Sequence, residues 1–154
     1  MSSSVERVKA ALASHGHDGE LRRFPDSTRT AADAAAAIGC TVAQIAKSIV
    51  LRTGDQPVLV VASGINRVDP AKVAALVGGR VKRADADWVR AVTGFAIGGV
   101  SPVGHLTQPL VLIDQDLGAL DPIWAAAGAP NEVFRTGFAD LVRISGGRVE
   151  DIRE

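Results

Sequence analysis

Lys47 is the side chain whose position most suggests chemistry. It lies in the segment QIAKSIVL (44–51), at the entrance of an apolar run that is typical of a buried strand. Lysine is rarely buried without a partner, so this position is unusual. Its ammonium could bind the carbonyl or the phosphate of a substrate. A lysine at a sheet edge whose charged head reaches solvent has the same spacing, and the spacing alone favours that simpler interpretation.

A second feature is the segment TGFAIGGVSPVGH (93–105), which interleaves four glycines and a proline with apolar residues. Glycine permits close backbone approach and positive φ angles. Consecutive backbone N–H groups can point at an anion or at a developing oxyanion, while Pro102 removes one donor and stiffens the turn. A β-bulge or a tightly packed corner explains the same glycines equally well.

Other chemistries find little support. His15, His17, His105 and Cys40 lack the close spacing of zinc ligands, so no metal is expected. The chain has no phosphate-binding P-loop, no dinucleotide fingerprint and no serine-nucleophile elbow. Cys40 could be a nucleophile, but a small buried residue beside a helix end is favoured, because nothing near it in sequence would lower its pKa.

Length and charge narrow the classes of protein. The 154 residues fit one domain over 1–154. A formal net charge of zero argues against a protein that coats nucleic acid, so no DNA partner is expected, although a small footprint on one end of an RNA stays open. One cysteine, no apolar signal segment and no apolar run of the ~20 residues that a span requires predict a cytoplasmic protein without a membrane partner.

Helix and strand patterns alternate without a linker, which predicts a mixed sheet surrounded by helices. Thr30 followed by Asp33 resembles a capping box, and Asp69 followed by Pro70 is a strong helix start. Turn residues at 54–57 separate two β-branched runs and predict a hairpin. We expect helices at 5–14, 30–39, 69–78, 85–92, 122–127 and 139–144, a helical turn at 41–46, and strands at 21–24, 48–52, 58–62, 110–114 and 132–135.

Three segments together resemble the YbaK/ProX family of aminoacyl-tRNA deacylases, which are editing domains related to the one inserted in bacterial prolyl-tRNA synthetases. TAADAA (30–35), IAKSIV (45–50) and TGFAIGGVSPVG (93–104) look like the family's threonine-initiated helix, lysine strand and glycine-proline loop, in the same order and spacing. The resemblance runs from about Val5 to Val149. Relatives often carry histidine where Phe24 precedes Pro25, and this departure leaves the amino-acid preference open.

The resemblance implies both a fold and a function. The fold is mixed α/β (α+β), one domain with a partly barrel-like sheet surrounded by helices. The function is hydrolysis, without metal or organic cofactor, of the ester that joins a wrong amino acid to a tRNA. The implied partners are the acceptor end of a mischarged tRNA, with tRNA-Pro as the natural candidate, and a prolyl-tRNA synthetase.

By position, the resemblance implies catalytic roles for Lys47, Gly99 and Ser101. We expect the ester and a small side chain (Ala, Cys, Ser or Thr) to be held by Thr28, Thr30, Phe95, Ile97, Gly98, Val100, Pro102, Gly104 and His105. Arg80, Lys82 and Arg83 are expected to contact acceptor phosphates, although a solvated charged face would have the same composition.

An aminoacyl ester is already activated, so the protein needs mainly to hold it and to polarise its carbonyl. Lys47 would do so, or would anchor the terminal phosphate, and N–H groups at 98–100 would complete an oxyanion site. Water or a substrate hydroxyl would attack, because no general base is evident. Two other functions stay open: a non-catalytic module that binds RNA or a synthetase, and a hydrolase of small free aminoacyl esters.

Overall fold

The computed structural model describes residues 3–24 and 30–154. Caps and turns along the chain divide it into short elements, several of which end at a glycine with positive φ. In chain order they are α1 (Ser3–Ser14), β1 (Leu21–Arg23), α2 (Ala31–Ile38), the 3₁₀ turn η1 (Val42–Gln44), β2 (Ile45–Thr53), β3 (Gln56–Ser63), α3 (Pro70–Val77), β4 (Lys82–Arg83), α4 (Ala86–Thr93), β5 (Leu110–Asp114), η2 (Gln115–Ala119), β6 (Ile123–Ala129), β7 (Glu132–Thr136), α5 (Phe138–Ser145) and β8 (Arg148–Glu150).

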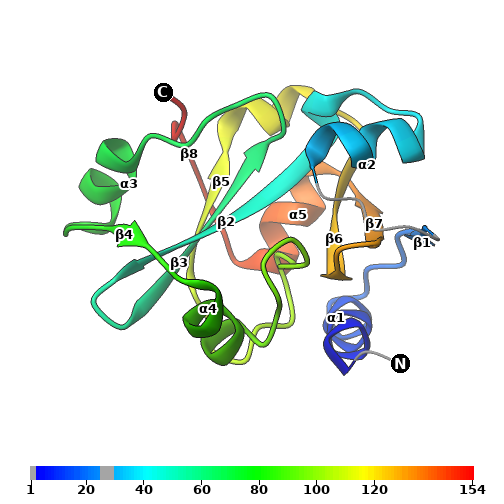
Figure 1. Ribbon diagram of the computed structural model, residues 1–154. Coiled ribbons are helices and arrows are strands. Elements are labelled where there is room, and N and C mark those ends of the chain that lie inside the picture. Colours follow the sequence, from blue (N-terminus) through cyan, green and yellow to red (C-terminus); the bar gives the residue numbers. More distant parts are fainter. Residues whose placement is uncertain (1–2, 25–29) are drawn as a thin grey trace.

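The strands form one mixed sheet in the order β1-β7-β6-β2-β3-β5-β8, with β4 paired to β2 (Figure 1). β2 and β3 make the predicted antiparallel hairpin, in which Gly54 and Asp55 connect the paired residues Thr53 and Gln56. The pairs β2–β6, β3–β5 and β5–β8 are parallel. The mixed sheet expected from the alternating pattern is therefore confirmed.

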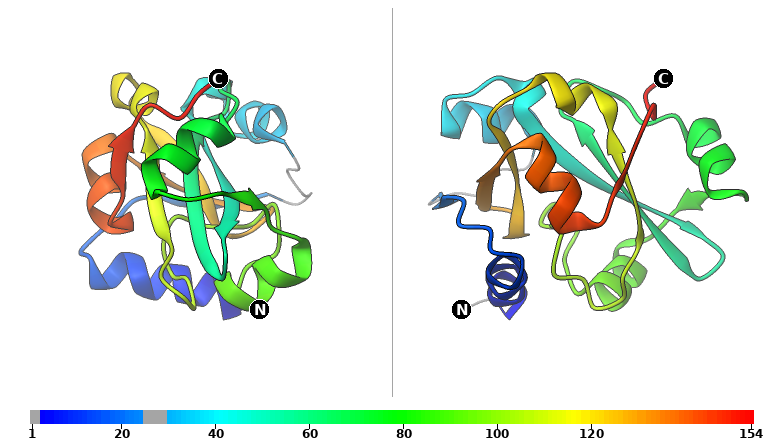
Figure 2. Two further views of the ribbon diagram at one scale, coloured as in Figure 1. Left: turned by 90° about the vertical axis from the view of Figure 1, so that its left-hand side faces the viewer. Right: turned by 180° about the vertical axis from the view of Figure 1, so that it is seen from behind.

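Helices pack on both faces of the sheet (Figures 1 and 2). On one face α1, α4 and α5 contribute Val8, Val89 and Leu141 to the largest apolar cluster. On the other face Val73 of α3 packs against alternate residues of β3. α2 covers the start of β2 together with β6 and β7, where Ala34 belongs to a third cluster. No helix in the described part of the chain is long and apolar enough to cross a membrane.

The two edges of β2 are paired differently, and part of one edge is left without a partner strand among the described residues. β3 covers one edge from Ala46 to Thr53. The other edge is shared, since β6 pairs with Ile45 and Ala46 whereas β4 pairs with Leu51 and Arg52. Residues 47–50 lie between these partners, and no described strand pairs with them there. An unpaired strand edge presents free backbone N–H and C=O groups.

Two predictions of secondary structure were wrong. Residues 122–127 were expected to form a short helix, but Pro122 precedes β6 and 123–127 belong to it, because pairing with β2 and β7 outweighs the helix propensity of their alanines. Lys47 was expected at the entrance of its strand, but β2 begins at Ile45 and Lys47 is its third residue. The expected helical turn at 41–46 is correspondingly shorter, over Val42–Gln44.

Candidate functional site

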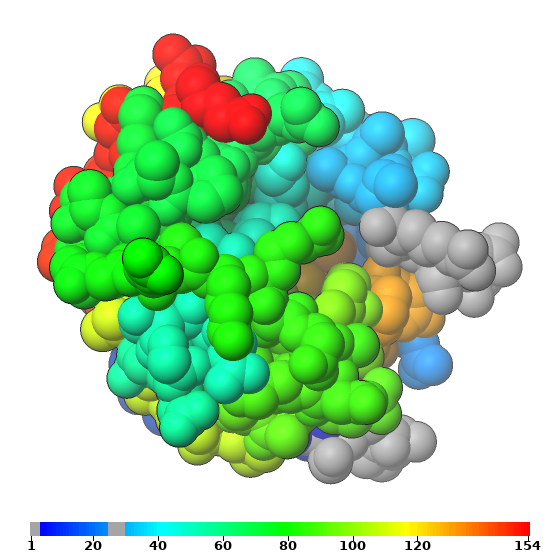
Figure 3. Space-filling view, turned by 60° about the vertical axis from the view of Figure 1, so that its left-hand side comes forward, coloured from blue at the N-terminus to red at the C-terminus, as the bar shows by residue number. Residues whose placement is uncertain are grey.

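Lys47 lines a cavity of about 340 Å³ at the open edge of β2. This volume falls within the range of about 300–1,000 Å³ that is usual for small-ligand pockets. Figure 3 shows the molecular surface hollowed between α2 (blue), β2 (teal) and the green segment before residue 100. The wall is mostly apolar and comes from α2, β2, the glycine-rich loop, β6 and β7; it includes Thr30, Ala31, Ala34, Ile45, Lys47, Ser48, Ile97, Gly98, Val100, Trp124, Glu132 and Val133.

The cavity reaches both faces of the sheet. Successive side chains of a strand point to opposite faces, so Lys47 and Ser48 project on opposite sides of β2. Ala46 belongs to the cluster that contains Val100, whereas Ile49 packs against the cluster on the other face. Because both Lys47 and Ser48 line the cavity, it passes around the open edge of β2.

Burial lowers the pKa of Lys47 below its ordinary value. The charge of Arg67 lowers this pKa further, whereas the carboxylate of Asp114 opposes the shift. The ammonium therefore holds its proton less tightly than an exposed lysine does. A partly desolvated cation also interacts more strongly with a ligand oxygen than a fully hydrated one, because the local dielectric is lower.

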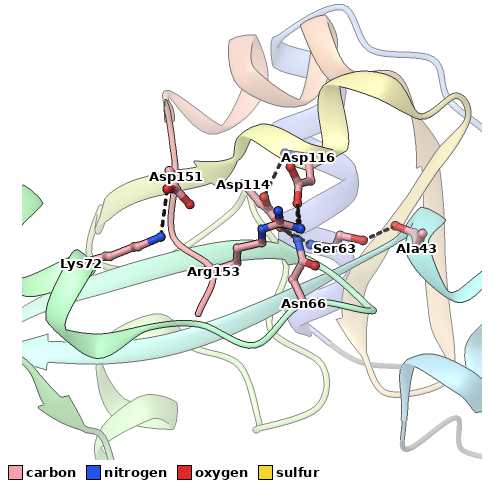
Figure 4. A network of polar contacts seen from close by, with 8 residues as sticks. All are labelled: Ala43, Ser63, Asn66, Lys72, Asp114, Asp116, Asp151 and Arg153. Carbon is pink, nitrogen blue, oxygen red and sulfur yellow. Dashed lines mark hydrogen bonds and ion pairs between the residues drawn. The ribbon is translucent and has the colours of Figure 1, made fainter.

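A buried polar network lies at the C-terminal ends of β3 and β5 (Figure 4). Asp114, at the end of β5, is fully buried. Its carboxylate accepts hydrogen bonds from the N–H of Ser63 at 3.0 Å, the Nδ2 of Asn66 at 2.8 Å and the N–H of Asp116 at 2.9 Å. These bonds fix the ends of β3 and β5, and β3 is the antiparallel partner of β2.

The glycine-rich loop closes one side of the cavity through Gly98 and Val100. Gly98 has a φ of +95°, which other residues adopt only with strain. At Gly99 a Cβ would lie 2.9 Å from the Cα of Ala129, so only glycine fits against this turn. The N–H of Gly99 already donates to the carbonyl of Ala96 at 3.0 Å. Of the three expected oxyanion donors, Gly99 is therefore already bonded, whereas the N–H groups of Gly98 and Val100 make no such backbone bond within the described part of the chain.

Ser101, His105 and Phe95 lie inside the loop, away from the cavity wall. Ser101 is fully buried, and its hydroxyl accepts the N–H of Val103 at 3.2 Å. The Nε2 of His105 donates to the carbonyl oxygen of Ser101 at 2.6 Å, and burial lowers the pKa of His105. Phe95 is fully buried and meets the His105 ring edge-on. The structure does not bring these three side chains to Lys47, and instead gives them a supporting position.

Arg7 of α1 holds the base of the same loop. Its Nε donates to the carbonyl of Gly104 at 3.1 Å, and its Nη2 donates to the carbonyl of Gly94 at 2.8 Å. The guanidinium also lies 5.0 Å from the centre of the Phe95 ring. Gly104 and Pro102 therefore belong to the anchored base of the loop and not to the cavity wall. No sequence signal indicated this role for Arg7.

Thr30 caps the N-terminal end of α2 and also lines the cavity. Its hydroxyl accepts the N–H of Asp33, whose carboxylate in turn accepts the N–H of Thr30, which confirms the predicted capping box. The box fixes the N-terminal end of α2, where Thr30 and Ala31 face the cavity. Thr28 lies outside the described residues.

Two cavity residues were missed from the sequence. Trp124 of β6 is 3% exposed, and the guanidinium of Arg22 lies 4.7 Å from its ring centre. Glu132, at the start of β7, brings a carboxylate to the cavity and pairs with Arg23 at 3.5 Å. The positions of both residues in the cavity wall depend on the pairing of β6 with β2 and β7. The wrong prediction of a helix at 122–127 hid this pairing.

The basic residues expected to contact tRNA lie together on the surface. Arg80 precedes β4, while Lys82 and Arg83 form it, and all three are exposed. Because β4 pairs with the end of β2, this basic strand borders the cavity edge. Among residues 3–24 and 30–154, no group of three His, Cys, Asp or Glu side chains is arranged to hold a metal ion.

Known proteins are similar to this chain over nearly its whole length. Residues 25–144 match the family model of the aminoacyl-tRNA editing domain. The solved structure of a candidate trans-editing enzyme for prolyl tRNA synthetase is 42% identical, with a TM-score of 0.94 over 100% of this chain and 99% of that one. The hypothetical protein APE2540 is 27% identical, with a TM-score of 0.89 over 96% of this chain and 99% of its own.

The uncharacterized protein YwhH of Bacillus subtilis (strain 168) is 29% identical over 147 residues, which cover 95% of this chain and 94% of YwhH. The match to the family model covers all the elements that build the cavity, namely α2, the lysine strand β2, the glycine-rich loop, β6 and β7. This chain belongs to the aminoacyl-tRNA editing domain family.

Proposed function

We propose that the protein is a free-standing trans-editing deacylase that hydrolyses the ester between a small wrong amino acid and a mischarged tRNA, with tRNA-Pro as the first candidate. The observation that carries the proposal is Lys47, a partly buried cation in the wall of an otherwise mostly apolar cavity. Membership of the editing family and the relative named for prolyl tRNA synthetase support it. Such a protein would act in the cytoplasm, where tRNAs are charged, with the synthetase as a functional partner.

The chemistry follows from where charge develops. Water adds to the acyl carbon, and the carbonyl oxygen becomes an oxyanion. The Lys47 ammonium donates a hydrogen bond to this oxygen, and the N–H groups of Gly98 and Val100 add to its stabilisation. The carbonyl then re-forms as the bond from the acyl carbon to the ribose oxygen breaks, the ribose oxygen takes up the proton that the attacking water loses, and the free amino acid leaves. Glu132 is placed to attract the α-ammonium of the substrate.

Selectivity for a small side chain follows from the apolar end of the cavity. Ala31, Ala34, Ile45, Trp124 and Val133 surround this end. A bulky ring would have to displace Trp124, which is almost fully buried. Exclusion by size is more efficient than the gain of about 1–3 kcal/mol that one methylene contributes to binding. Esters of Ala, Cys, Ser or Thr are therefore the proposed substrates.

The test is deacylation of a panel of mischarged tRNAs. It would contain tRNA-Pro carrying Ala, Cys or Ser, and tRNAs carrying Ser or Thr. Lys47→Ala should fold and lose at least about a hundredfold in rate, as expected for a donor to the oxyanion. Lys72→Ala is the control, because Lys72 is a surface lysine paired with Asp151 at 2.9 Å. Turnover that persists in Lys47→Ala would remove the role of Lys47. Binding of tRNA without turnover would indicate a non-catalytic module instead.

A further inference from the structure

A second cavity, of about 170 Å³, continues the first along the open edge of β2. The two cavities share Ser48, Ile49, Ile97, Gly98 and Val100. Lys47 lines only the first, whereas Arg83 and Ala84, at the end of β4, line only the second. Together the cavities form one groove with an ammonium toward one end and a guanidinium toward the other.

Pro57 determines which backbone groups of β2 face this groove. Pro57 pairs with Arg52 and has no N–H, so this pair is not a hydrogen-bonded one. Bonded and non-bonded pairs alternate along an antiparallel ladder. Val50 and Ser48, two and four residues before Arg52, therefore also occupy non-bonded positions. Their N–H and C=O groups point away from β3 and toward the edge between β6 and β4.

Neither neighbouring strand uses the central groups of this edge. The ladder with β6 ends at Ala46, and the ladder with β4 begins at Leu51. The C=O of Ser48 and the N–H of Val50 flank Ile49, so they offer an acceptor and a donor side by side. The hydroxyl of Ser48 is also buried without a hydrogen-bond partner among the described residues. Buried polar groups in proteins are nearly always hydrogen-bonded, so this edge is suited to a ligand with the complementary groups.

We propose that this edge binds an adenine base, which in the proposed function is the terminal base of the tRNA acceptor end. The 6-amino group of adenine donates to the C=O of Ser48, and its ring N1 accepts the N–H of Val50. Proteins read unpaired bases through hydrogen bonds on this edge and through contacts with the flat faces. Ile97, which is 59% exposed and lines both cavities, supplies an apolar contact.

The same placement accounts for the two charges of the groove. With the base against Ser48 and Val50, the ribose ester lies in the first cavity, where Lys47 meets the carbonyl. The 5′ phosphate of the nucleotide lies toward Arg83, as charge requires. Only 47–50 are open along this edge, so an extended peptide could add a ladder of a few residues at most, whereas a single ring needs only one acceptor and one donor.

The first test varies the terminal base of an aminoacylated RNA minihelix. Purine riboside lacks the 6-amino group, 1-deazaadenosine lacks the N1 acceptor, and 7-deazaadenosine keeps both and is the control. We expect kcat/KM to fall about three- to tenfold for each of the first two, as for the loss of one hydrogen bond, and to stay unchanged for the control. Equal kcat/KM on adenosine and 1-deazaadenosine would overturn the adenine site and leave the deacylase intact.

A matched pair of variants tests the donor itself. Val50→Pro deletes the N–H at a position that is not bonded to β3, whereas Val50→Ala keeps it. The preference for adenosine over 1-deazaadenosine should vanish in Val50→Pro and persist in Val50→Ala. Its persistence in a folded Val50→Pro protein would contradict the proposal. If this variant does not fold, the base series on the wild type still decides.

A third measurement does not depend on turnover. Adenosine 5′-monophosphate, titrated into the wild-type protein, should shift the amide resonances of Ser48 and Val50, and its 1-deaza analogue should shift Val50 less. Shifts without any deacylase activity would refute the proposed function while retaining the adenine site, which then serves a free nucleotide. Unmoved amides would refute the site. An extended peptide that moves these amides where the nucleotide does not would reassign the edge to a protein strand.

Discussion

At the scale of single residues, the surroundings of Lys47 in the cavity wall lower the pKa of its ammonium group. Burial and the charge of Arg67 lower its pKa. The protonated form that polarises the ester is fully present below this pKa and is lost as the pH rises through it. We therefore expect kcat/KM, corrected for spontaneous ester hydrolysis, to decline on the alkaline side at a lower pH than an ordinary lysine, near 10.4, would give.

Lys47→Arg provides the control for this assignment. Arginine keeps its charge over the whole accessible range, so the alkaline decline should move to higher pH even if the rate is lower. The α-amino group of the substrate also titrates, but it does so equally with both proteins. An alkaline limb that coincides in the wild type and Lys47→Arg would show that a group other than Lys47 controls it.

Trp124 sets the size of the apolar end of the cavity. Trp124→Leu should enlarge this end and raise kcat/KM for a bulky aminoacyl ester relative to an alanyl ester by about tenfold or more. Trp88 offers a matched control, since Arg52 lies 4.3 Å from its ring centre just as Arg22 covers Trp124, but Trp88 does not line the cavity. An equal change of preference in Trp88→Leu would point to general loosening instead of selection by size.

At the scale of elements, α1 controls a loop that is distant in sequence. Arg7→Ala removes two partly buried hydrogen bonds to the loop carbonyls of Gly94 and Gly104. We expect a loss of about 2–3 kcal/mol in the free energy of unfolding, from the two bonds and the carbonyls left without partners. Amide hydrogen exchange over 94–104 should also accelerate, because these bonds anchor the base of the loop.

Lys9→Ala is the control on the same helix, since Lys9 is exposed and its ion pair within the described residues is with the exposed Glu6, at 3.7 Å. It should unfold at nearly the same urea concentration as the wild type. If Arg7→Ala matched Lys9→Ala in both urea unfolding and hydrogen exchange, the loop would be held by its own packing and Arg7 would be incidental.

The elements also show which parts of the site can be predicted from sequence. Local signals were sufficient for the capping box of Thr30 and for the β2–β3 hairpin, because each depends on residues close together in the chain. β6 was mistaken for a helix, since its alanines favour helix until β2 and β7 pair with it. The places of Trp124 and of the open edge beside Lys47 depend on where distant strands begin and end, and no local spacing encodes that.

At the scale of the whole molecule, charge is balanced overall and concentrated locally. Seventeen basic and seventeen acidic side chains give a formal net charge of zero. Long-range attraction to RNA is therefore weak, and affinity must come from a small set of contacts. The exposed Arg80, Lys82 and Arg83 beside the groove are that set in our proposal.

A salt titration of tRNA binding tests this footprint. Each phosphate contact contributes roughly 0.7–0.9 to the slope of log K against log salt. Replacing Arg80, Lys82 and Arg83 by alanine should lower the magnitude of this slope by about two to three and weaken binding most at low salt. Arg143→Ala is the control, because Arg143 pairs with Asp140 on α5, outside the groove. An unchanged slope in the triple variant would place the phosphate contacts elsewhere, and Arg22, Arg23 and Arg90 would be replaced next. A smaller slope, with deacylation of free aminoacyl esters unaffected, would separate tRNA binding from the chemistry at Lys47.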